Sequence, residues 1–198
     1  MSNIDKLGIG DSFDASVTRN AGSSDQIGLE GRYTFACYDK DGNLKWTDGI
    51  ENLTTNVGRA NLLDSYFANT GGGAVVMGLM TYNAVPVSTP AYTDTQSSHA
   101  GWFEAGSAHA PSYSGTRKTP SFSSATSANP SVLSTASAVV FSMTGSGTVT
   151  GAFINIGGSS TIDDTTGTLF SAGNFTAGSK TVTSGDTINV TYTLSAAG

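Results

Sequence analysis

The eight residues Thr187-Ile188-Asn189-Val190-Thr191-Tyr192-Thr193-Leu194 decide the fold class of this chain. Apolar and polar side chains alternate along the whole stretch, which places four apolar residues on one face: Ile188, Val190, Tyr192 and Leu194. Successive side chains of a β-strand point to opposite faces of the sheet, so a strand with one buried face alternates in this way. The stretch therefore predicts a half-buried strand of an antiparallel sheet.

Further stretches of strand character are separated by turn residues along most of the chain. The clearest pair is Arg32–Tyr38 and Leu44–Thr47, which the turn residues Asp39–Asn43 join into a predicted β-hairpin. Other strands are predicted at 74–81, 138–143, 148–156, 168–172 and 181–183, with short ones around 101–104 and 120–123. Short strands with a turn about every 8–12 residues are typical of all-β folds. The prediction is a mainly β protein, an antiparallel β-sandwich or barrel.

One segment has helical rather than strand periodicity. Thr54 or Thr55 can cap its start, and the glycine-rich residues 69–73 can end it. The apolar residues that recur at helical spacing and share one face of this helix are Leu53, Val57, Ala60, Leu63 and Phe67. The sequence predicts one short α-helix near residues 53–68.

The composition divides the chain into an N-terminal arm and a β-rich domain. Residues 1–30 carry sparse apolar side chains among Gly, Ser and Asp, and we expect an extended arm there. Residues 31–198 form the predicted β-rich domain, and their stretch 83–131 holds all five prolines and predicts long loops. The arm is either free or ordered against a neighbouring subunit. In the second case its candidate partner contacts are Ile4, Leu7, Ile9 and Phe13.

The charge pattern argues against two classes of partner. Formal net charge is −6, and the nine Lys and Arg residues are scattered without a basic stripe, which disfavours binding to nucleic acid or to anionic lipid. No apolar run is long enough to span a membrane, and the first residues lack the apolar core of a secretory signal. We expect synthesis in a reducing cytosol, which the single Cys37 fits.

The residues that commonly carry chemistry form no familiar motif. His99 and His109 are the two histidines, and no nucleophile elbow accompanies them, so we expect structural roles in which they pair with loop backbone. The acidic turn Asp39–Asn43 has its glycine at the wrong position for a calcium loop, and no zinc or dinucleotide spacing is present. The sequence predicts no catalytic, cofactor-binding or metal-binding residue. A hydrolase that uses His99 or His109 is the competing hypothesis.

Three stretches stand out together: Gly42–Trp46 leading into Glu51–Leu53, then Ser98-His99-Ala100-Gly101-Trp102-Phe103-Glu104, and the closing Ser184–Tyr192. Their order and spacing resemble a family of small structural proteins from tailed bacteriophages. The similarity covers about residues 32–195, and the second stretch is its most specific part.

The resemblance implies a non-enzymatic role in the virion, most plausibly as a capsid decoration or cement protein. The alternative is a host-binding module associated with the tail or a fibre, for which a cluster of surface aromatic residues is expected. The implied partners are the major capsid protein or other virion proteins. Closed symmetry favours a homo-oligomer, and the three-fold positions of a capsid would suit a trimer.

Overall fold

The computed structural model describes residues 28–68, 70, 72–82 and 89–197. This part of the chain holds eleven strands, one α-helix, α1 (Asn56–Leu63), and one π-helical turn, Asp64–Ala68. The strands are β1 (Gly28–Tyr38), β2 (Leu44–Thr54), β3 (Val75–Tyr82), β4 (Trp102–Glu104), β5 (Ser131–Ser134), β6 (Val139–Ser142), β7 (Gly147–Val149), β8 (Gly151–Ile156), β9 (Thr168–Asn174), β10 (Lys180–Val182) and β11 (Thr187–Ala197). Mainly β architecture with one short helix is confirmed.

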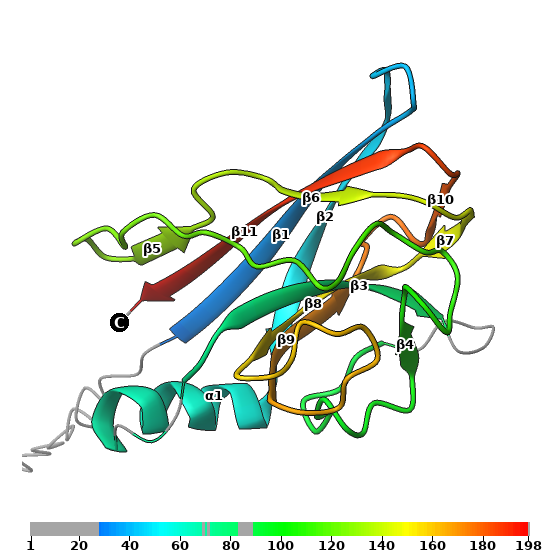
Figure 1. The fold of residues 1–198 in the computed structure, drawn as a ribbon. Helices are drawn as coiled ribbons and strands as arrows, with labels where there is room; N and C mark the ends of the chain where they lie inside the picture. Colours follow the sequence, from blue (N-terminus) through cyan, green and yellow to red (C-terminus); the bar gives the residue numbers. More distant parts are fainter. Residues whose placement is uncertain (1–27, 69, 71, 83–88, 198) are drawn as a thin grey trace, which may run out of the picture.

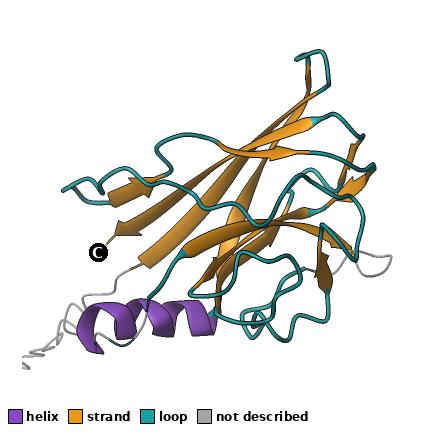
Figure 2. Ribbon diagram, viewed as in Figure 1, coloured by secondary structure: helices purple, strands orange, loops and turns teal. Residues whose placement is uncertain are grey.

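Two antiparallel layers share strand β2 and enclose the core, which makes the fold a β-sandwich (Figures 1 and 2). The first layer runs β2-β1-β11 and then splits into β5 and β6, while the second runs β2-β9-β8-β3-β4. Strand β2 pairs with β1 over most of its length but reaches β9 only through Leu53 and Thr54. Between the layers, the Tyr33 hydroxyl and the Ser171 hydroxyl are hydrogen-bonded at 2.7 Å.

The two layers differ in how many of their faces are buried. In β11 the residues Ile188, Val190 and Tyr192 are buried and the alternate ones are more exposed, as the alternating pattern predicts. In contrast, β3, β8 and β9 are buried at nearly every position because loops cover their outer face. Continuous apolar runs are typical of strands that are buried on both faces. The second layer therefore has a second small core, formed by Met80, Trp102, Phe153, Leu169 and Ala172.

The helix is shorter than predicted and packs through a different face. Leu53 belongs to β2, α1 begins after its N-cap Thr55, and Val57 and Leu63 are exposed. The helix instead contacts β9 through Gly58, where an added Cβ would lie 2.8 Å from the Cα of Phe170. The predicted apolar face was wrong. Leu53 lies in strand β2 and not in the helix, so its helical spacing from Val57 does not reflect a shared helix face.

Other boundaries also differ from the sequence prediction. The single strand predicted at 148–156 is two strands, β7 and β8, which pair in different sheets on either side of Thr150. Strand β5 was not predicted, and the strand expected at 120–123 is reduced to one bridge between Phe122 and Thr135. Because β1 begins at Gly28, residues 28–30 of the predicted arm belong to the sheet.

The remaining predicted strands are present, most with small shifts at their ends, but β2 continues to Thr54, seven residues beyond the predicted end at Thr47. The hairpin of β1 and β2 turns at Asp39–Asn43, where the Asp39 carboxylate accepts hydrogen bonds from the backbone of Asp41 at 2.9 Å and of Asn43 at 2.8 Å. Gly42 has a φ of +83° in this turn, a conformation that glycine adopts without strain. The edge strands β4, β5 and β6 are all short, which limits edge-to-edge pairing with other chains.

Candidate functional site

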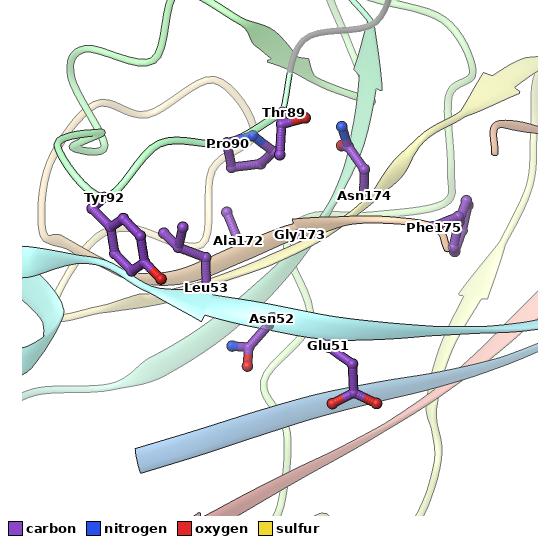
Figure 3. Close-up of a pocket in the computed structure, with 10 residues that line it drawn as sticks. All are labelled: Glu51, Asn52, Leu53, Thr89, Pro90, Tyr92, Ala172, Gly173, Asn174 and Phe175. Atoms are coloured by element: carbon purple, nitrogen blue, oxygen red, sulfur yellow. The ribbon is translucent and has the colours of Figure 1, made fainter. Parts of the chain in front are cut away.

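A groove lies on the described surface where β2 and β9 separate. Its volume is about 440 Å³, within the range of about 300–1,000 Å³ that is usual for ligand sites. Figure 3 shows Tyr92 at one end and Phe175 at the other, with Leu53, Ala172 and Gly173 between them. We call it the Tyr92 groove, and the remaining residues that line it are Glu51, Asn52, Thr89, Pro90 and Asn174.

Close packing of two strands forms the floor of the Tyr92 groove. Pairing of β2 with β9 ends after Leu53 and Ala172, and the strands then diverge. Gly173 leaves no room for a side chain, since a Cβ there would overlap with the Ile50 side chain and lie 3.4 Å from the Cα of Asn52. The glycine therefore lets β9 approach β2 while leaving the groove open above it.

Tyr92 is held in place by its own turn and by the helix. The backbone N–H of Asn56 donates to the Tyr92 carbonyl at 2.9 Å, and the Asp94 carboxylate accepts from the Ala91 N–H at 3.1 Å. The Arg59 guanidinium lies 5.6 Å from the ring centroid in a cation–π arrangement. The ring is nevertheless 55% exposed, so this is a fixed aromatic surface that a ligand can reach.

The Tyr92 groove combines an aromatic face with uncharged polar groups. Its acidic residue is Glu51, whose carboxylate lies 3.2 Å from the Arg32 guanidinium. Both side chains are largely exposed, so the attraction within this ion pair is weak. An aromatic face with amide and hydroxyl groups around it suits a neutral polar ligand with one apolar face, such as a sugar ring.

Both histidines line a second, smaller pocket, which we call the histidine pocket. It has a volume of about 140 Å³, and its acidic residues are Glu104, Asp163 and Asp164. His99 stacks on Trp102 with ring centroids 3.9 Å apart, and its Nδ1 is 3.0 Å from the Trp102 carbonyl oxygen. His109 stacks on Phe103 at 3.8 Å.

The carboxylates of the histidine pocket already have partners. Glu104 accepts two hydrogen bonds from Arg117, at 2.8 and 2.6 Å, and one from the backbone N–H of Asp163 at 2.9 Å. Asp163 in turn accepts from the Ser107 hydroxyl at 2.9 Å. Hydrogen bonds from Thr166, against a smaller effect of desolvation, lower the pKa of Asp164 below its ordinary value. These groups join the loops around 94–118 to the loop 157–167.

This arrangement favours a structural function for the histidine pocket. Within the part of the chain that the structure describes, no group of acidic, histidine or cysteine side chains is arranged to hold a metal ion. Cys37 lies inside the sandwich, and burial raises its pKa to about 11, which leaves the thiol protonated and unreactive at neutral pH. His99 does contact the backbone, as predicted for a histidine, but its partner Trp102 is the first residue of β4 and not a loop residue.

The structure gives different outcomes for the residues that the sequence singled out. The candidate partner contacts Ile4, Leu7, Ile9 and Phe13 lie outside the described residues. The structure brings His99 and His109 together in one pocket, which no sequence pattern predicts.

Three features of the sites were not predicted from the sequence: the Tyr92 groove, the buried Arg117 and its partner Glu104. The sequence signal for the groove was the pair of turn residues Pro90 and Asp94 on either side of Tyr92. Residues of this kind fix the conformation of a loop and therefore the position of the tyrosine. The signal for Glu104 was its place in the stretch Ser98–Glu104, whose buried Trp102 donates from Nε1 to Asp94 at 3.2 Å.

Comparison with known proteins identifies no relative of this chain. No protein-family model matches it, and neither the curated proteins nor the solved structures contain a significant match. Among the described residues, no helix is both long enough and apolar enough to cross a membrane.

Proposed function

We propose that this chain is a non-enzymatic structural protein of a bacteriophage particle, and that it decorates or cements the capsid. The similarity of its three sequence stretches to small tailed-phage proteins supports this role. The observation that carries the proposal concerns the most specific of these stretches. Trp102 and Glu104 are buried, and they hold the loops 94–118 and 157–167, which we call the loop layer, against the second sheet. Because the buried residues of this stretch hold loops in place, the stretch favours a structural role.

A particle component must keep its shape outside the cell, and this chain, with one cysteine, would have to do so without an internal disulfide. Cys37 is a free thiol, so the loops depend on packing and polar contacts. The Arg117 side chain is fully buried, and besides Glu104 it donates to the carbonyls of Ser159 at 3.0 Å and Asp164 at 2.7 Å. Charge-assisted hydrogen bonds of this kind are about twice as strong as neutral ones.

The outer face of the first sheet offers a surface for contact with other subunits. It carries small hydroxyl side chains from adjacent strands, and Ser134 and Thr193 are hydrogen-bonded to each other at 3.0 Å. The exposed threonines on this face are Thr34, Thr47 and Thr191. Interface cores are depleted of charged residues, which fits the hydroxyl-rich part of this face around Thr34 and Thr191, whereas the exposed Arg32–Glu51 ion pair lies beside it on the same face. Weak contacts of this kind become effective when many copies bind one particle.

Labelling of intact particles tests the proposed role. An epitope inserted between Asp41 and Gly42 would lie at the exposed tip of the β1–β2 hairpin, which Figure 1 shows projecting from the sandwich. A second epitope between Ala177 and Gly178 would serve as an independent position in another exposed turn. We expect both tagged chains to be labelled on phage heads. Absence of both labels from particles, with circular dichroism showing folded protein, would contradict the proposal.

The Tyr92 groove favours a second candidate function, a host-binding module of the tail or a fibre. Its fixed and exposed tyrosine, beside uncharged polar groups, suits a sugar of the host surface. We expect Tyr92→Ala to abolish binding to host polysaccharide if this function holds. Tyr82→Ala is the matched control, because Tyr82 is also exposed but does not line the groove. Equal binding by both variants and the unmodified chain would exclude the groove.

A further inference from the structure

The open end of the sandwich beside α1 contains an apolar cavity. Its volume is about 190 Å³, and its lining comes from both sheets, from the helix and from the loop that carries Phe122. Six of the side chains around it are only half buried, and we call them the apolar mouth: Leu62, Val75, Phe122, Leu133, Ile156 and Leu194.

The chemistry of the mouth selects an apolar occupant. No charged residue lines the cavity, so it offers nothing to hold an ion or a strongly polar ligand. Apolar surface gains about 25 cal/mol for each Å² that is removed from water, and six half-buried side chains side by side leave such surface uncovered.

The N-terminal segment of this chain joins the fold at the same end. Strand β1 begins at Gly28, which pairs with Ala197, and Gly31 pairs with Leu194 of the mouth. Three residues of a strand span about 10 Å, so the segment leaves the sheet close to the cavity. Figure 1 shows the start of β1, the end of β11, strand β5 and α1 at this one end of the molecule.

We propose that the apolar mouth binds the N-terminal segment of the same molecule, with the ring of Phe13 in the cavity. Phe13 is one of four apolar residues in the segment, with Ile4, Leu7 and Ile9. These residues are too few to build a core by themselves. An apolar cavity of about 150 Å³ accommodates benzene, so the mouth has room for a phenyl ring.

The length of the connection favours binding within one molecule over binding between two. Residues 14–27 lie between Phe13 and the first strand and can span up to about 50 Å when extended, several times the distance to the cavity. A tether of this length gives an effective concentration of the order of millimolar, above the concentration of a second copy in dilute solution. This inference does not depend on the proposed role in the virion.

Disulfide trapping in the full-length chain tests the proposal. The test variant is Ser12→Cys with Leu133→Cys, which keeps the Phe13 ring, and the matched control is Ser12→Cys with Val140→Cys. Val140 is exposed on β6, which pairs with the same β11 strand as Leu133 does. Cys37 can stay in place because its buried thiol is protonated at neutral pH.

We expect the test variant to form an intramolecular disulfide, seen as a faster-migrating monomer without reductant, and the control to remain reduced. A disulfide-linked dimer as the main product would overturn the proposal and show that a second copy supplies the occupant. No disulfide in the test variant, or equal disulfide formation in both variants, would also overturn it.

A second measurement avoids any change in the mouth itself. The dye ANS fluoresces when it binds accessible apolar surface. We expect Phe13→Ser to raise ANS fluorescence severalfold over the unmodified chain, because the mouth is vacated. Val140→Ser, which removes an apolar side chain from the outer face of the sheet, should leave it unchanged. Equal fluorescence of the unmodified chain and Phe13→Ser would show that Phe13 does not cover the mouth.

Discussion

Replacement of Arg117 by methionine tests whether the loop layer depends on one buried ion pair. The side chain has no exposed surface, and it is engaged by Glu104, by the carbonyls of Ser159 and Asp164, and by the Phe153 ring 5.4 Å away. Methionine fills similar space but provides no donor. The substitution therefore leaves the Glu104 carboxylate buried without its counter-ion.

The expected loss of stability is large for a single substitution. Removal of one partner from a buried ion pair costs about 3–5 kcal/mol, because the other charge remains uncompensated. For a chain of this size, each kcal/mol lowers Tm by about 2–4 °C, so the expected decrease is roughly 6–20 °C.

The loss should depend on pH in a defined direction. Burial raises the pKa of Glu104 above its ordinary value, and Arg117 opposes this effect, so Arg117→Met should raise the pKa further. An acid with a raised pKa in the folded state holds its proton more tightly there than in the unfolded chain. Its stabilising contribution is present at low pH and is lost as pH rises through the folded-state pKa. The variant should therefore be least destabilised in acid.

Denaturant unfolding of the variants at about pH 4 and about pH 8 measures these effects. The control is the double variant Glu104→Gln with Arg117→Met, which has no buried charge and should recover part of the stability at the higher pH. A loss below about 1 kcal/mol at neutral pH for Arg117→Met, as for an exposed pair, would refute the reasoning.

Three further predictions concern the helix, a buried carboxylate and the histidine pocket. Gly58→Ala should destabilise the fold by about 1–3 kcal/mol in denaturant unfolding, despite its higher helix propensity, because the new methyl group overlaps with the Phe170 backbone. Burial raises the pKa of Asp186, but hydrogen bonds from Lys45 and Thr183 outweigh it and hold this pKa below its ordinary value. Its contribution is present at neutral pH and is lost as pH falls through the folded-state pKa, so Asp186→Asn should cost about 1–3 kcal/mol at neutral pH and less in acid. Alanine in place of either pocket histidine should cost about 0.5–1.5 kcal/mol through the lost stacking and leave attachment to particles unchanged in a co-sedimentation assay. Loss of a hydrolytic activity in a well-folded histidine variant would contradict the non-enzymatic role.

The strands could be predicted because their side-chain pattern follows directly from burial. Alternation in 187–194 reflects one buried face, and the apolar run at 74–81 reflects burial on both faces. The helix end could not be placed, because Leu53 fits equally well at the end of a strand and at the start of a helix. Only the pairing of Leu53 with Ala172, which are far apart in the sequence, decides between the two.

The candidate sites depend on contacts that no local pattern contains. The Tyr92 groove needs β9 beside β2, and the histidine pocket needs the loop 157–167 beside His99 and His109. The two histidines could be placed in loops from the sequence, but no local pattern shows that they share a pocket. The buried Arg117 was equally hidden, because its partner Glu104 and its carbonyl acceptors come from separate loops.

A cryo-EM map of the intact particle that contains this chain tests the central claim most directly. The sandwich has an asymmetric outline, with the long β1–β2 hairpin at one end and α1 at the other, which allows its placement in density (Figure 1). The proposed role predicts sandwich-shaped density at repeated positions on the outer surface of the capsid, in contact with the major capsid protein. A capsid surface without such density, or a fit at the tail or fibre tip alone, would contradict it.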